Sequence, residues 1–426
     1  MINRKTEPAI KDAVDFNLHL KNFEYFELDN GVPVYAINAG AQEVVLAEWV
    51  FYAGNWYEEK NIVAATANHL LKNGTVGKNA FAINEHFEFY GAYLNRNCYN
   101  ETANITLHAL TRHLPELLPV VAEIISDSVF PEEELAIYQQ NQKQRLKVNL
   151  KKCDFVANRL IDEYVYGLSH PYGKYTTMAD YDALQRDEVA RFYNRFYSKG
   201  KCILFVAGKL PADIQAQLNN AFGKLPLNKE TLPIVQHAQV LAIQKKYNVV
   251  NDEAGVQGAV RLARPFPNRH HADFPKVQVL NNIFGGYFGS RLMSNIREDK
   301  GYTYGIHSHI QNHIQNTALL VSTEAGRDVC AATINEVYNE MKVLREELVD
   351  EEELHLVRNY MMGTILGDLD GPFQIIARWK NYILNNLTED YFYNSINTIK
   401  TISAEELREL ANKYLVPDDY FELVVV

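Results

Sequence analysis

The segment from residue 64 to residue 75 reads AATANHLLKNGT and contains part of a metal-binding pattern. In the spacing H-x-x-E-H, two His side chains on one helical face bind zinc, and the Glu takes a proton from zinc-bound water. His69 stands at the second His position, whereas Ala65 stands at the first His and Asn68 at the Glu. A methyl group cannot bind a metal, and an amide cannot act as the base. The segment therefore keeps the spacing of a hydrolytic zinc site without its chemistry.

A second set of residues with chemical potential lies between positions 285 and 305. Gly285 and Gly286 open a glycine-rich turn, and glycine permits positive φ and a close approach to a bound chain. Arg297 and Tyr304 follow in the run IREDKGYTYG. A guanidinium group offers five donors and a fixed charge to carbonyl oxygens, and the Tyr hydroxyl adds a directed hydrogen bond. The alternative is that Arg297 pairs with a neighbouring acid and Tyr304 packs within a strand.

Composition narrows the class of protein that must position these residues. The chain has 426 residues, which fits two domains of ordinary size. Apolar residues make up 47% and charged residues 22%, as in soluble globular proteins, and the net charge of −11 argues against nucleic acid and anionic membranes as partners. The four cysteines are widely spaced, and no apolar leader or membrane-length run is present, so a cytoplasmic location is expected.

Apolar spacing and turn residues predict two halves with the same order of elements. Residues 224–240 contain prolines and little periodicity, which indicates a linker. At an offset of roughly 210–220 residues, strand 102–110 corresponds to 316–324, helix 114–127 to 327–345, and strand 202–208 to 421–426. We expect an α+β fold of two duplicated α/β-sandwich domains, residues 1–228 and 229–426, each with a mostly antiparallel sheet packed with helices.

Element order, length, duplication and these motifs together resemble the insulinase/pitrilysin family of inverted-motif zinc metallopeptidases. Its half-size members include the subunits of mitochondrial processing peptidase and of paired bacterial peptidases. In that family a Glu on a later helix is the third zinc ligand, and the resemblance places Gln140 and Lys147 at the two acidic positions of that helix. Because a Lys repels a cation, no zinc is expected on this chain, and His69 is then interpreted as a hydrogen-bonded core His.

The resemblance also implies a function. Arg297 and Tyr304 match the family pair that holds the substrate backbone near zinc, which in paired enzymes belongs to the chain without the metal. The chain is expected to be half of a clamshell: a non-catalytic, peptide-binding subunit of a heterodimeric zinc metallopeptidase, inactive alone, whose sister chain has an intact motif and the zinc. A homodimer is the other assembly considered. Two alternatives stay open, namely a structural subunit of a larger complex and an active zinc peptidase with an atypical metal site.

Overall fold

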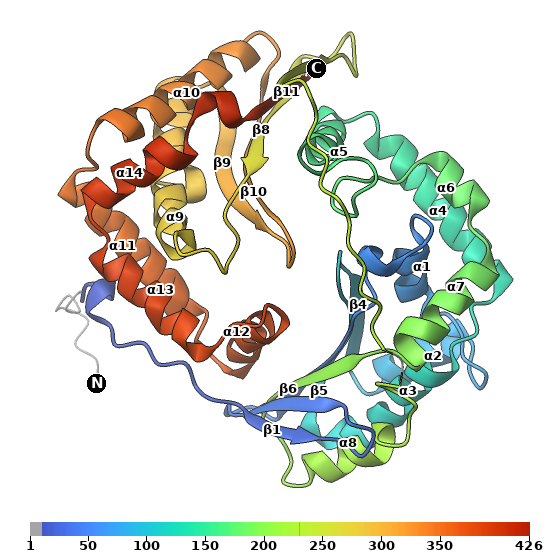
Figure 1. The fold of residues 1–426 in the computed structure, drawn as a ribbon. Coiled ribbons are helices and arrows are strands. Elements are labelled where there is room, and N and C mark those ends of the chain that lie inside the picture. Colours follow the sequence, from blue (N-terminus) through green and yellow to red (C-terminus); the bar gives the residue numbers. More distant parts are fainter. Residues whose placement is uncertain (1–10, 230) are drawn as a thin grey trace. The chain divides into compact units, whose positions relative to one another are not determined.

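The computed structural model describes residues 11–229 and 231–426 and divides the chain into two compact units (Figure 1). One unit contains Lys21–Ile243 and Gly371–Asn381, and the other contains the N-terminal residues to Leu20, Gln244–Asp370 and Tyr382–Val426. We call them the first and the second unit. The halves expected from the sequence, 1–228 and 229–426, stay a prediction. Each unit also takes in a segment from the other half of the sequence, namely the residues up to Leu20 in the second unit and Gly371–Asn381 in the first.

The sheet of the first unit has the strand order β1-β2-β6-β3-β5-β4. The strands are β1 (Glu24–Glu27), β2 (Pro33–Asn38), β3 (Val44–Phe51), β4 (Tyr93–Cys98), β5 (Ala103–Leu110) and β6 (Cys202–Gly208). All neighbours are antiparallel except β2 and β6, which are parallel. The chain between β1 and β2 turns at Gly31, whose φ of 79° is favourable only for glycine, as the Asp-Asn-Gly signal predicts.

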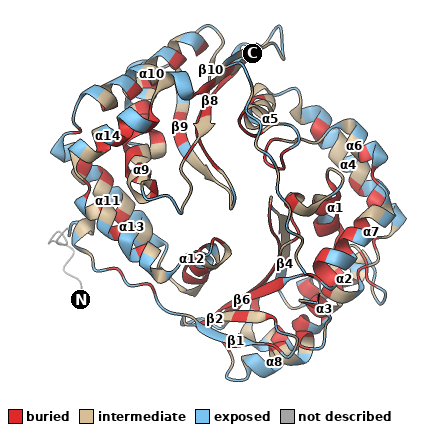
Figure 2. Cartoon of the chain, viewed as in Figure 1, coloured by how far each residue is buried: buried red, intermediate tan, exposed pale blue. Residues whose placement is uncertain are grey.

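The first unit contains the helices α1 (Val63–Leu70), α2 (Ala80–Phe89), α3 (Leu114–Asp127), α4 (Glu132–Asn149), α5 (Cys153–Tyr166), α6 (Met178–Ala183), α7 (Arg186–Tyr193) and α8 (Ile214–Phe222). All of them except α5 bury apolar residues in a common core with this sheet. The core includes Trp49 and Phe51 of β3, Leu70 of α1, and Ile124 of α3. Figure 2 shows the buried residues on the sides of these helices and strands that face one another.

The sheet of the second unit has the order β7-β11-β8-β10-β9. Its strands are β7 (Lys246–Val249), β8 (Gln257–Pro265), β9 (Thr303–Asn312), β10 (Thr317–Gly326) and β11 (Phe421–Val425). Its helices are α9 (Phe274–Asn281), α10 (Cys330–Glu346), α11 (Glu351–Gly367), α13 (Glu389–Thr401) and α14 (Ala404–Tyr414). Because β9 is the last strand in this order, one of its edges has no neighbouring strand among the residues that the structure describes.

The two sheets share one topology. In each, a parallel pair (β2/β6 and β7/β11) is followed by three antiparallel strands. This places β6, β3, β5 and β4 in correspondence with β11, β8, β10 and β9, as the sequence offset predicts. The expected α+β class, with two mostly antiparallel sheets packed by helices, is confirmed. Two short elements, α6 and β7, were not predicted from sequence.

Helix α12 (Pro372–Leu384) begins in the first unit, although it lies late in the sequence. The indole N–H of Trp379 donates to the carbonyl oxygen of Lys21 at 2.8 Å, and the ring of Phe373 contacts that of His108. Lys380 pairs with Glu48 of β3. The late segment is therefore part of the packing of the first unit. Within the described residues, no helix is both long and apolar enough to cross a membrane.

Candidate functional site

The helix with the degenerate zinc pattern, α1, starts at an unusual backbone position. Ile62 precedes it with φ of 68°, a left-handed conformation that a β-branched residue rarely adopts. The carboxylate of Glu58 accepts the amide hydrogens of Ile62 at 3.3 Å and Ala64 at 2.9 Å, and Lys174 pairs with the same carboxylate at 2.5 Å. This cap satisfies amides at the helix start that have no partner within the helix. It fixes where the following residues of α1 point.

Asn68, at the position of the missing base, is a buried structural residue. Its side chain amide donates to the carbonyl oxygen of Asn104 and to the hydroxyl of Tyr197, both at 3.2 Å, and the residue is 3% exposed. Asn104 in turn donates to Glu48, which is paired with Lys380. The amide therefore begins a chain of hydrogen bonds that crosses the sheet. Ala65, at the first ligand position, is half-buried and offers no donor atom.

His69 is exposed, so the interpretation of it as a buried core His is wrong. Its ring lies against that of Tyr138, with 4.7 Å between the centroids, and its carbonyl oxygen accepts a hydrogen bond from the guanidinium of Arg96. The ring is covered on the side of Tyr138, and this partial loss of water, together with the charges of Arg96, Lys72 and Arg145, lowers the pKa of His69 to about 4. The imidazole is therefore neutral at pH 7 and faces basic side chains.

The residues of α4 that lie near His69 come two positions earlier in the sequence than expected. Gln140 and Lys147, predicted at the acidic positions, are exposed, and neither is among the groups that contact or charge the imidazole. Tyr138 and Arg145, which have the same spacing along the helix, take those places. One turn of helix advances by 3.6 residues, so a shift of two residues moves a side chain to the far side. Tyr138 and Arg145 are the residues that the sequence interpretation missed.

The side chains around His69 do not fit a zinc ion. Zinc sites combine His, Cys and carboxylate ligands, usually four in a tetrahedron. Here one imidazole is accompanied by Lys72, Arg96 and Arg145, whose charges repel a cation. Across residues 11–229 and 231–426, no group of three His, Cys, Asp or Glu side chains is arranged to hold a metal ion.

The pKa of His69 provides a direct test of this environment. We expect its imidazole to titrate near pH 4 in an NMR titration, because protonation would add a charge beside three others. The folded pKa lies below the unfolded value of about 6.5. The unfolded chain therefore takes up the proton first as the pH falls, and this group lowers stability between about pH 6.5 and pH 4. A midpoint near 6.5 in the folded protein would contradict the arrangement.

Arg297 and Tyr304 are brought together in the second unit. Arg297 lies in the π-helical turn η6 (Met293–Asp299), and Tyr304 follows at the start of β9. The guanidinium carbon of Arg297 is 4.7 Å from the ring centroid of Phe288 and 5.5 Å from that of Tyr304. Tyr304 is 92% exposed and Phe288 64% exposed. The expectation that Tyr304 could instead pack within the strand does not hold. Two rings orient Arg297, and among the described residues its guanidinium group forms no ion pair with a neighbouring acid.

A β-bulge presents Tyr304 in this way. Ile306 pairs with Thr323, but Thr303 pairs with Ala325, so β9 has one residue more than β10 between these points. The hydroxyl of Thr323 donates to the carbonyl oxygen of Gly305 at 2.9 Å, and the hydroxyl of Thr303 accepts the amide hydrogen of Gly305 at 3.1 Å. Bulges redirect side chains near functional sites. The two Thr hydroxyls therefore hold the backbone that turns Tyr304 outward.

Gly285 and Gly286 were expected to provide a positive φ, but the structure uses them for close packing instead. Neither has a positive φ. A Cβ on Gly285 would lie 2.7 Å from the hydroxyl oxygen and 2.8 Å from the amide nitrogen of Ser308 on β9. A Cβ on Gly286 would lie 3.0 Å from Asn281. Both glycines therefore allow the turn to pack tightly, and their contact with substrate stays a prediction.

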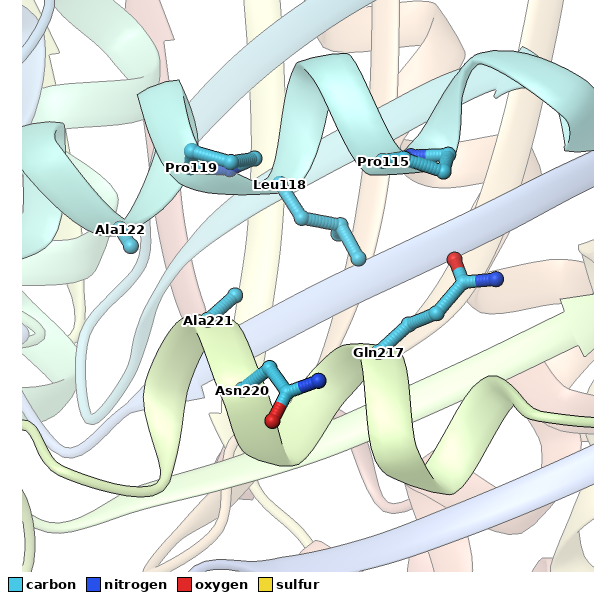
Figure 3. A pocket seen from close by; sticks show the side chains of 7 residues that line it. All are labelled: Pro115, Leu118, Pro119, Ala122, Gln217, Asn220 and Ala221. Carbon is cyan, nitrogen blue, oxygen red and sulfur yellow. The ribbon is translucent and has the colours of Figure 1, made fainter.

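Two surface grooves in the first unit lie apart from these residues. The groove in Figure 3 has a volume of about 420 Å³ and lies between α3 and α8. Its lining residues have no charge: Pro115, Leu118, Pro119, Ala122, Gln217, Asn220 and Ala221. The second groove, of about 380 Å³, is lined by Val63 at the start of α1 and by residues of α7. Its Lys60 and Glu188 are already paired at 2.8 Å. Neither groove contains the residues singled out by sequence.

Two family models and several known proteins match this chain. Residues 34–169 match the insulinase (peptidase family M16) domain, and residues 183–361 match the peptidase M16 inactive domain. A Bacillus subtilis (strain 168) protein named uncharacterized zinc protease YmxG is 23% identical over 408 residues, which is 93% of this chain and 96% of that protein. A Helicobacter pylori (strain 26695) protein named non-peptidase homolog YmxG is 21% identical over 390 residues, covering 87% and 86%.

Solved structures show the same fold. A peptidase M16 inactive domain from Pseudomonas fluorescens superposes with a TM-score of 0.83 at 21% identity and covers 95% of this chain and 98% of that one. A protease from Helicobacter pylori gives a TM-score of 0.86 at 16% identity and covers 96% and 100%. The matched domains together extend over most of the sequence, and the chain belongs to the insulinase family of peptidases, M16, with a C-terminal domain of the inactive type.

Proposed function

We propose that this M16 protein is the non-catalytic, substrate-binding subunit of a two-chain zinc metallopeptidase. The proposal depends mainly on Arg297, which the rings of Phe288 and Tyr304 orient at an exposed strand end. The helix that would hold zinc, in contrast, has no suitable set of ligands. The name non-peptidase homolog for a Helicobacter pylori relative supports a non-catalytic role.

The chemistry of the pair suits an extended peptide. A peptide backbone presents carbonyl oxygens, which a guanidinium and a phenolic hydroxyl can both serve as donors. The free edge of β9 lies directly beside Tyr304, and exposed edges accept a peptide as an added strand. Bond cleavage then requires a sister chain with an intact H-x-x-E-H motif and its zinc. The cytoplasm is the proposed location, which cell fractionation would check.

Replacing Arg297 with Ala is expected to lower kcat/KM of the reconstituted pair about 10- to 100-fold. A hydrogen bond from a charged donor contributes about 1.5–3 kcal/mol, and each 1.36 kcal/mol is about tenfold in rate. The measurement is peptide hydrolysis by this chain mixed with its zinc-containing sister. Lys300→Ala is the matched control, because Lys300 is an exposed cation close to Arg297 in the sequence.

The outcome also separates the proposal from its alternatives. If Arg297→Ala and Lys300→Ala leave the activity of the pair equally unchanged, the substrate-holding role is wrong. Purification from the native source with an unrelated complex in place of a zinc peptidase would favour a structural subunit. Stoichiometric zinc that is lost in His69→Ala would favour an atypical active enzyme.

A further inference from the structure

We propose that the degenerate zinc site has become an anion site that binds an organic carboxylate through Lys72, Arg96 and Arg145. We call these three residues the cationic site. The inference goes beyond the proposed function, because it concerns the first unit and requires no partner chain. The proposed ligand is negatively charged, whereas the zinc ion of an active enzyme is positively charged.

The cationic site draws one residue from each of three elements. Lys72 follows α1, Arg96 lies on the edge strand β4, and Arg145 lies on α4. All three act on the same imidazole, that of His69, and Arg96 also donates to its carbonyl oxygen. Packing of α1 against β4 and α4 therefore gathers charges that are well separated in sequence.

These cations are not neutralised by the protein. In the part of the chain that the structure describes, none of the three forms an ion pair, whereas neighbouring Lys78 and Lys143 pair with Glu123 and Asp182. The Nε of Arg96 is buried and has no hydrogen-bond partner. Buried polar groups normally have partners, so an unsatisfied guanidinium donor beside two more cations indicates a missing acceptor.

The surrounding titratable groups leave the positive charge in place. The charge of Glu88 acts on the pKa of Lys72, but the two side chains are not among the ion pairs that the described residues form. The phenols of Tyr93 and Tyr197 lie near Arg96, and burial raises the pKa of the Tyr197 phenol further above its ordinary value. Burial lowers the pKa of Arg96 to about 10, so it keeps its proton. An anion placed here would relieve the mutual repulsion of three charges.

A carboxylate is the group that fits best. The Nη1 group of Arg96 is used by the carbonyl oxygen of His69, so donors on the rest of its planar fork remain. That fork matches the two oxygens of a carboxylate, and Lys72 and Arg145 supply further point charges. The carboxylate can belong to a peptide C-terminus or to a small free acid, and the two sources share this chemistry.

An NMR titration tests the proposal on the isolated chain. The imidazole signals of His69 are followed while a short neutral peptide with a free C-terminus, the same peptide with an amidated C-terminus, acetate, or inorganic phosphate is added. We expect the free-acid peptide or acetate to shift these signals and raise the His69 pKa, because a bound anion offsets the neighbouring cations. Amidation should weaken peptide binding at least about tenfold.

Matched variants on one helix supply the control. Arg145→Gln should weaken carboxylate binding about tenfold, because it removes one charge-assisted contact. Lys147→Gln should leave it unchanged, because Lys147 is exposed on the same helix and does not act on His69. Preference for the peptide over acetate would identify a C-terminus as the source, and the reverse a small acid. The proposal is overturned if the free and amidated peptides bind equally and acetate does not bind. It is also overturned if phosphate binds more tightly than the carboxylates, or if the two variants have equal effects.

Discussion

Replacing Asn68 with Glu is expected to lower the free energy of unfolding by about 3–5 kcal/mol, even though it restores the residue type of the catalytic base. Asn68 donates to the carbonyl oxygen of Asn104 from a position that is 3% exposed. A carboxylate only accepts hydrogen bonds, so Glu would place negative oxygen beside that carbonyl oxygen in a buried site. The longer side chain would also crowd α1 against β5.

The change is measured as the midpoint of urea unfolding against the native chain. Asn68→Asp, which adds the charge without adding length, should cost nearly as much if the loss of the amide donor dominates. Asn141→Glu serves as the control, because Asn141 is exposed on α4 and surface changes stay within about 0.5 kcal/mol. A stable Asn68→Glu protein with a native midpoint would show that the amide has no structural role.

Replacing Lys380 with Met is expected to cost about 3 kcal/mol, because it leaves Glu48 as a buried charge without its cation. Lys380 lies 2.9 and 2.7 Å from the two carboxylate oxygens of Glu48, which is 6% exposed. Asn104 supplies a further hydrogen bond to the same carboxylate. Met keeps most of the apolar part of the side chain and removes the ammonium group with its charge and its hydrogen-bond donors. The exposed fraction of the Lys380 side chain, 26%, places the effect at the lower end of the range for buried pairs.

The double variant Lys380→Met/Glu48→Gln distinguishes lost pairing from lost packing. It removes both charges, so unfolding measurements should recover most of the stability lost in Lys380→Met. Glu48→Gln alone should cost less than Lys380→Met, because Lys380 reaches solvent and can be hydrated. If the double variant is no more stable than Lys380→Met, the pair does not hold α12 against the first sheet in the way proposed here.

Local sequence patterns predicted most of the elements. Helix α3 and strand β6 occur at the residues expected, and the repeated order of strands reproduces the shared topology of the two sheets. These features depend on apolar spacing, which reports which face of each element is buried. Short elements such as β7 have too few residues to show a period, and their formation depends on a neighbouring strand, here β11.

Register and side-chain environment were predicted less well. The sequence placed Gln140 and Lys147 at the metal position, but α4 presents Tyr138 and Arg145 to His69. Most of α4 is polar, so its pattern does not mark one buried face, and the turn that contacts α1 is set by packing. In α1 the difficulty is the opposite one. Most residues of this helix are buried, so the sequence gives no sign that His69 is exposed.

The amino-acid types alone determined that this chain lacks the donors of the family's zinc site, because no conformation gives Ala65 a ligand atom or Asn68 a basic oxygen of the required strength. The tertiary structure decided what replaced them. Contacts between elements far apart in sequence gathered Lys72, Arg96 and Arg145 around His69, joined Lys380 to Glu48, and set Arg297 between Phe288 and Tyr304. Chemical identity is local to a residue, whereas charge environment and exposure arise from the packing of many residues.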